Sequence, residues 1–67
     1  MNEIIFVVEE SPEGGYTAKA LGASIVTEGD TILELQENIK DAIHCHFDVN
    51  KPKIVRLHMV KELVFAA

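Results

Sequence analysis

The segment TEGDTILELQENIKDAI, residues 27–43, constrains the fold more than any other stretch, because it has the pattern of one well-capped amphipathic helix. Thr31 and Glu34 have the Thr-x-x-Glu spacing of a capping box, which predicts that the helix begins at Thr31. At about 100° per residue, the apolar side chains share one face and the polar side chains lie opposite, so one face is expected to pack on a sheet. The apolar face comprises Ile32, Leu35, Ile39, Ala42, Ile43 and Phe47, and the polar face comprises Glu34, Glu37, Asn38 and Asp41.

The residues before the helix predict three antiparallel strands. EIIFVVE, residues 3–9, is a β-branched and aromatic run that is typical of a strand buried on at least one face. ESPEGG then predicts a turn, because Pro12 presets one φ angle and the paired glycines permit positive φ. YTAKAL is expected to form a hairpin with the first strand, and SIVTEG, residues 24–29, predicts a short third strand.

A final strand is predicted after the Lys-Pro pair at 51 and 52, which stops the helix. KIVRLHMVKELVFAA, residues 53–67, is longer than a usual strand, so a bulge or break near Lys61 and Glu62 is expected. Its apolar end, LVFAA, lies either in the interior of the sheet or against another subunit, because an exposed apolar edge promotes aggregation. The predicted oligomer interface is Leu63, Val64 and Phe65.

The predicted order is β-β-β-α-β, an α+β fold in which one helix packs on one face of an antiparallel-rich sheet. All 67 residues are assigned to a single domain. A domain of this size buries only roughly 60% of its unfolded surface, close to the limit below which oligomerisation often supplies the missing burial. We therefore expect a homodimer or a higher homo-oligomer.

The charge of the chain argues against direct nucleic-acid binding. The net charge is −5, whereas phosphate binding needs clustered Lys and Arg. Residues 1–34 hold seven acidic and one basic side chain, so a basic protein partner would be attracted to this half. No stretch reaches the roughly 20 apolar residues needed to span a bilayer, and the N-terminus lacks the pattern of a signal peptide, so the chain is expected to be cytoplasmic.

The histidines and the single cysteine do not form a recognisable site. In the sequence HCH, residues 44–46, the two imidazoles lie two positions apart on a helix and cannot chelate one ion. His46 is expected at a boundary or interface on the apolar face, between Leu35 and Ile39, and His58 is expected to face solvent. No metal or cofactor is predicted, and the roles of His44, Cys45, His46 and His58 stay open.

A divergent metal-dependent nuclease using Glu9, Glu28 or Asp30 is the enzymatic alternative. Such a site needs acids that converge from neighbouring elements on metal ions about 4 Å apart. The centre of the first strand, IIFVV, offers no ligand, and turn capping explains the acids at 28 and 30. The sequence favours a non-enzymatic protein.

Two motifs suggest a family: EGGYTAKA after the first strand, and EGDTILELQENIKDAI across the turn and the helix. Together they resemble the N-terminal domain of HicB-like antitoxins, a partial RNase H-type domain, over about residues 4–47. The resemblance implies the β-β-β-α-β fold without catalytic carboxylates. It also implies that the chain binds and masks a small basic ribonuclease toxin, HicA.

The chain departs from that family in two places. Typical full antitoxins carry a C-terminal helix-turn-helix or ribbon-helix-helix domain, and no residues remain for one here, so no DNA-binding domain is expected. The connection LGAS also replaces the Pro-Gly turn of many relatives. The leading hypothesis is a non-enzymatic antitoxin-type interaction module, and the alternative is an orphan structural oligomer without a toxin partner. The predicted partner-binding residues are Glu9, Glu10, Glu13 and Tyr16.

Overall fold

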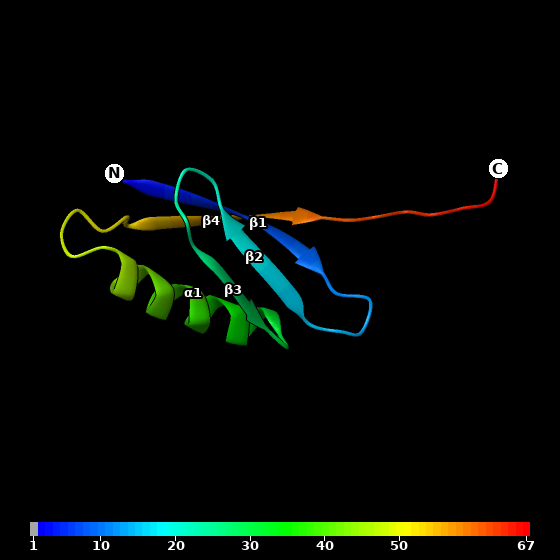
Figure 1. The fold of residues 1–67 in the computed structure, drawn as a ribbon, viewed down its shortest axis with the longest axis horizontal. Coiled ribbons are helices and arrows are strands. Elements are labelled where there is room, and N and C mark those ends of the chain that lie inside the picture. Colours follow the sequence, from blue (N-terminus) through cyan, green and yellow to red (C-terminus); the bar gives the residue numbers. More distant parts are fainter. Residues whose placement is uncertain (1) are drawn as a thin grey trace.

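The computed structural model describes residues 2–67, and they form four strands and one helix in the predicted order (Figure 1). The fold class, α+β with the order β-β-β-α-β, is therefore confirmed. The elements are β1 (Glu3–Glu10), β2 (Tyr16–Ala20), β3 (Val26–Gly29), α1 (Ile32–His46) and β4 (Ile54–Val60).

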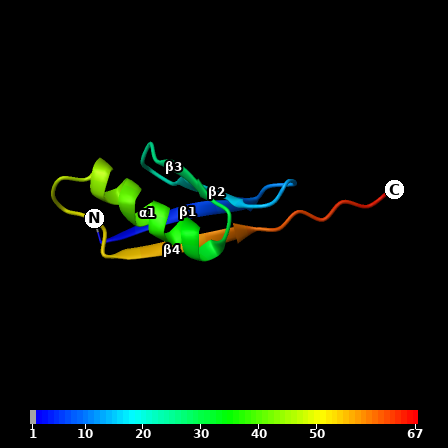
Figure 2. The same cartoon turned by 90° about the horizontal axis from the view of Figure 1, so that it is seen from below.

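The four strands form one sheet in the order β3-β2-β1-β4. The first three strands pair antiparallel, as the predicted meander requires, with Tyr16 opposite both Glu10 and Gly29. The last strand pairs parallel with β1, from Glu3 beside Ile54 to Glu9 beside Val60. A parallel pair needs a long crossover connection, and α1 supplies it. The helix thus covers one face of the sheet and leaves the other uncovered (Figure 2).

The core lies between the helix and the covered face of the sheet. Alternate residues of β1 point toward α1, and the apolar stripe of the helix meets them. On the helix, Leu35, Ile39 and Ile43 are buried as predicted, whereas Ile32 and Ala42 are half-buried at its margins. The buried residues are Ile4, Phe6, Val8, Ala18, Ile25, Leu35, Ile39 and Ile43.

The helix begins where the capping pattern predicted. The hydroxyl of Thr31 accepts a hydrogen bond from the backbone N–H of Glu34 at 3.1 Å, and Thr31 itself has extended backbone angles. At the other end, the backbone N–H of Phe47 donates to the carbonyl of Ile43 at 3.0 Å. The cap satisfies a backbone donor that the first turn leaves free.

Replacing Thr31 with alanine is expected to lower the free energy of unfolding by about 1 kcal/mol, because the N–H of Glu34 loses its acceptor. Thr31→Ser is the matched control, since serine keeps the hydroxyl. Urea denaturation followed by circular dichroism measures both variants. Equal stability of Thr31→Ala and the unchanged protein would contradict the capping role.

The turn between β1 and β2 uses its glycines as the sequence predicted. Gly14 and Gly15 adopt φ angles of 98° and 84°, in the region that favours glycine. The backbone N–H of Ser11 donates to the carbonyl of Gly15 at 2.9 Å, and that of Gly14 donates to the carbonyl of Ser11 at 3.0 Å. These bonds close the hairpin tightly.

The third strand is shorter than predicted. It was expected over residues 24–29, but it runs over Val26–Gly29. Ile25 lies just outside the strand, buried in the core, and its carbonyl accepts a hydrogen bond from the N–H of Ala20 at 3.0 Å. The loop around Gly22, which has φ 81°, leads the chain into this position.

The last strand ends at Val60, so the predicted break before Lys61 and Glu62 is confirmed. Residues 61–67 continue away from the sheet in line with β4 (Figure 1). Leu63, Val64 and Phe65 are 84%, 79% and 82% exposed, so of the two predicted alternatives for LVFAA, the one that places it inside the sheet of one chain is wrong. The chain has no fifth neighbouring strand in residues 2–67 for this segment to join. Burial against another subunit stays a prediction.

Within residues 2–67, no helix combines the length and the apolar character that crossing a membrane requires.

Candidate functional site

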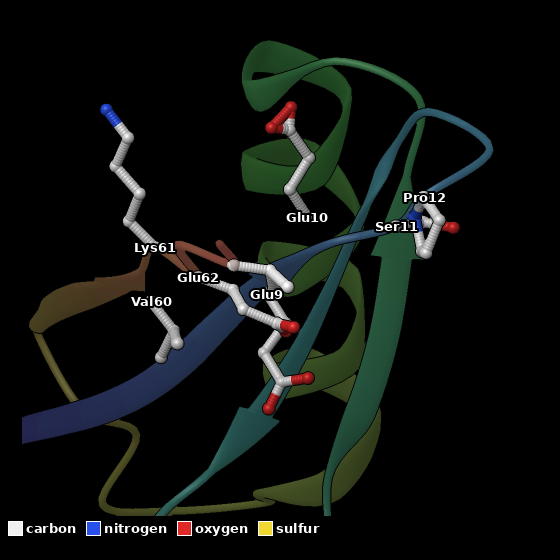
Figure 3. A pocket seen from close by; sticks show the side chains of 8 residues that line it. Glu9, Glu10, Ser11, Pro12, Val60, Lys61 and Glu62 are labelled. Carbon is white, nitrogen blue, oxygen red and sulfur yellow. The ribbon is translucent and has the colours of Figure 1, made fainter. Parts of the chain in front are cut away.

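The predicted partner-binding residues lie together at the hairpin end of the molecule. Glu9 and Glu10 end β1, Glu13 lies on the turn, and Tyr16 begins β2. Glu9 and Glu10 point to opposite faces of the strand (Figure 3). Tyr16 pairs with Glu10 across the hairpin and packs against the core, so it is only half-exposed. The hairpin therefore presents its three carboxylates to solvent and uses the tyrosine partly as a structural anchor.

Two open hollows flank this hairpin. The first, of about 690 Å³, lies between the end of β1 and the chain that leaves β4 (Figure 3). The second, of about 320 Å³, lies between the hairpin and the start of α1. Ser11 lines both hollows, so they are adjacent.

Each hollow is lined by three acidic side chains. The first is lined by Glu9, Glu10 and Glu62, with Lys61 as its one basic residue. The acids of the second are Glu28, Asp30 and Glu34. With Glu13 on the turn between them, most of the acidic charge of the chain gathers at this end. Carboxylates of one sign that crowd a surface create a negative potential that attracts cationic partners.

The sequence placed the acidic charge in residues 1–34 and named the hairpin acids, but it did not reveal that Glu28, Asp30, Glu34 and Glu62 lie beside them. The acids of the second hollow lie beside the hairpin because β2 pairs with β3, which puts Tyr16 opposite Gly29. Glu62 joins because Glu9 lies beside Val60 in the parallel pair. A prediction of strand pairing would have found both groups, since each follows from a register and not from a local motif.

Asn38 was assigned to the polar face of the helix and has a further role. Its side-chain amide donates to the backbone carbonyl of Glu28 at 2.6 Å, and the residue is half-buried. This bond joins α1 to β3 at the floor of the second hollow. The acidic surface therefore rests on a fixed junction of the helix and the sheet.

The carboxylates considered for a nuclease do not share one hollow. Glu9 lines the first, whereas Glu28 and Asp30 line the second. Among the side chains of residues 2–67, no group of three or more His, Cys, Asp or Glu is placed to hold a metal ion. The arrangement offers dispersed negative charge to a ligand.

His44, Cys45 and His46 lie at the end of α1, away from the acidic hollows, whereas His58 lies on β4 two residues before Val60, which lines the first hollow. His44 and Cys45 are exposed in the last turn of α1, and the Nδ1 atom of His44 lies 2.9 Å from the Nζ of Lys51. His58 faces solvent on β4, as predicted.

The projection of His46 onto the apolar face of the helix holds, because α1 extends to His46, but the residue does not lie at a partly buried boundary of this chain. The side chain is exposed, and its ring meets the edge of Phe47 at a centroid distance of 4.9 Å. His46 is the last residue of α1, and it lies beyond the part of the helix that packs on the sheet.

Comparison with known proteins identifies relatives of the same length class. The chain is 50% identical over 64 residues to a UPF0150 protein of Thermotoga maritima, covering 96% of this chain and 91% of the relative. It is also 50% identical over 52 residues to a UPF0150 protein of Archaeoglobus fulgidus, covering 76% and 77% of the two chains. No protein-family model and no solved structure matched the chain. Identity of this level over most of both chains shows that the protein belongs to the UPF0150 family.

Proposed function

We propose that this chain is a non-enzymatic, HicB-like interaction module whose acidic end binds and masks a small basic protein, of the kind that a HicA-like RNase toxin represents. The observation that carries the proposal is the gathering of carboxylates from β1, the turn, β3, α1 and the chain after β4 around two adjacent hollows. The starts of both motifs that resemble those of HicB-like antitoxins, EGGY and EGDT, lie at this end of the molecule. No direct nucleic-acid partner is proposed, because the net charge is −5.

The geometry suits a protein partner better than a small substrate. The hollows are open, and their acids are spread along two sides of a rigid hairpin. Lys and Arg side chains of a partner could each pair with a separate carboxylate without displacing the others. Such complementarity raises the rate of association and makes binding sensitive to salt.

A binding role also agrees with the distribution of reactive side chains. The thiol and two imidazoles lie at the far end of α1, which begins beside the acidic hollows and runs about 22 Å away from them. The chain therefore holds its thiol and these two imidazoles apart from its acidic hollows. We place this function in the cytoplasm, where a lone exposed cysteine such as Cys45 stays reduced.

Reversing charge at the hairpin is expected to weaken binding to a small basic partner tenfold or more, equivalent to about 1.4 kcal/mol. The test variant is Glu10→Lys with Glu13→Lys. The matched control is Asp41→Lys with Asp48→Lys, which makes the same change in net charge at exposed positions outside both hollows. Calorimetric titration with a purified, small basic RNase toxin of the HicA-like class, at low and at physiological salt, measures the affinities.

The hairpin variant should lose affinity and the control should lose little, and the difference should shrink as salt rises. The unchanged chain should also inhibit RNA cleavage by a toxin of this class. Absence of binding at micromolar concentration, or equal losses in both variants, would refute the proposed function.

A further inference from the structure

The outer edge of β4 is unpaired. This strand lies at the end of the sheet and bonds only to β1 among residues 2–67. Besides Arg56 and His58, it exposes apolar side chains on both faces of the sheet, namely Ile54, Val55, Met59 and Val60. A long edge strand with exposed apolar side chains is a template for pairing with another strand.

The helix leaves the covered face of β4 incompletely packed. It approaches β3 and β2 closely but not β4. Between α1 and β4 runs a groove of about 290 Å³ lined by Gln36, Ile39, Lys40, Val55 and Leu57. Its lining is mostly apolar, so it is suited to apolar side chains.

Residues 61–67 have the side chains and the direction to fill such a groove in another copy. They extend in line with β4 and lie in solvent (Figure 1). Alternation along the chain places Leu63 and Phe65 on the same face as Leu57 and Val55. They cannot reach the groove of their own chain, because the segment runs away from it.

We propose that two copies of this chain associate through an antiparallel ribbon of residues 54–66, with Val60 on the two-fold axis, so that Leu63 and Phe65 of each copy cover the α1–β4 groove of the other. The two sheets then join into one continuous sheet through their β4 edges. The interaction is isologous, since the same residues serve both copies.

The pattern of side chains selects the register. Directly opposed residues of an antiparallel pair lie on the same face of the sheet. The apolar residues of both copies therefore lie on one face only if the two-fold axis passes through a residue, and not between two residues. With Val60 on the axis, Leu63 lies opposite Leu57, Phe65 lies opposite Val55, and Glu62 lies opposite His58.

The neighbouring registers are less favourable. An axis through Lys61 puts two lysines directly opposite each other, and like charges so placed are destabilising. An axis through Met59 puts Lys61 opposite Leu57, which lines the groove, whereas the axis through Val60 puts Lys61 opposite Met59, which does not. The sequence is thus self-complementary about Val60.

The ribbon does not include the turn between β1 and β2. Four residues of the ribbon, Val60, Lys61, Glu62 and Val64, do line the first hollow, whereas the hairpin acids and the second hollow lie outside it. Mass and cross-linking report the pairing and titration reports partner binding, so the two outcomes can be separated. A chain that dimerises but binds no basic protein would overturn only the proposed function, and a monomer that binds one would overturn only the dimer.

Cysteine cross-linking tests the register with the full chain. In a Cys45→Ser background, Val60→Cys is compared with Met59→Cys and Lys61→Cys during oxidation with copper-phenanthroline. Opposed Cβ atoms lie about 5 Å apart and diagonal ones about 7 Å, whereas a disulfide needs about 4 Å. The covalent dimer of Val60→Cys should form about tenfold faster than either other dimer. Faster cross-linking at 59 or 61 would overturn the proposal.

Light scattering tests the association itself, with the expected mass being twice that of the 7.4 kDa chain. Phe65→Lys should give monomers with a lower midpoint of unfolding, because a charge cannot enter the apolar groove. Leu33→Lys is the control, since it places the same charge at an exposed position outside the ribbon. Circular dichroism checks that both variants fold. A monomeric unchanged chain, or a Phe65→Lys variant that keeps the dimer mass, would overturn the proposal.

Discussion

Replacing Gly29 with alanine is expected to lower the free energy of unfolding by about 3 kcal/mol or more, a large share of the roughly 3–10 kcal/mol that a domain of this size has. The end of β3 meets the first turns of α1 at this residue. An alanine Cβ would lie 2.6 Å from the backbone nitrogen of Leu35 and 2.8 Å from its Cα. Both are backbone atoms of a buried helical turn, so a rotamer change cannot relieve the overlap. The helix would have to move off the sheet.

Position 29 requires glycine because there is no space for a Cβ. Its backbone angle does not require glycine, because its φ lies outside the left-handed region. Gly14→Ala is the contrasting control. Gly14 has a φ of 98°, but a Cβ there meets nothing within 4 Å, so only backbone strain of about 1–2 kcal/mol is expected. Urea denaturation at one protein concentration measures both variants. A loss at Gly29 no greater than that at Gly14 would show that the helix and sheet can separate there freely.

The features that the sequence predicted well are those with local causes. The capping box at Thr31 and the 3.6-residue apolar period fixed the start and the buried face of α1. The paired glycines at 14 and 15 predicted the hairpin turn, because few other residues adopt their φ angles. Each signal lies within a few residues of the structure that it specifies.

The features that the sequence did not predict depend on contacts between distant residues. GDT marked the end of the third strand, but nothing in it revealed that Gly29 would touch Leu35. The sequence located most of the acids within residues 1–34, but not how the hairpin acids and those at 28 and 30 come together, since that depends on the β2–β3 register. His46 follows the helical period correctly, yet that period does not reveal where the sheet stops covering the helix.

Which face of α1 is buried can be tested by comparing the loss of stability at two leucines that lie two residues apart. Leu35→Ala is expected to lower the free energy of unfolding by about 2–5 kcal/mol, because the side chain is fully buried and its removal leaves a cavity. Leu33→Ala makes the identical chemical change on the same helix, where the side chain is 71% exposed. Leucine and alanine both favour helices, so this control is expected to change stability by no more than about 0.5 kcal/mol.

The contrast between these leucines isolates burial from helix propensity, because the two substitutions alter propensity alike. Urea unfolding by circular dichroism, at equal protein concentrations, gives both free energies, and equal concentrations matter because association would add to the apparent stability. Equal losses would mean that the helix does not pack through the face that carries Leu35, Ile39 and Ile43. A loss confined to Leu35 would fix the orientation of α1 on the sheet, and with it the position of the helix start that builds the second acidic hollow.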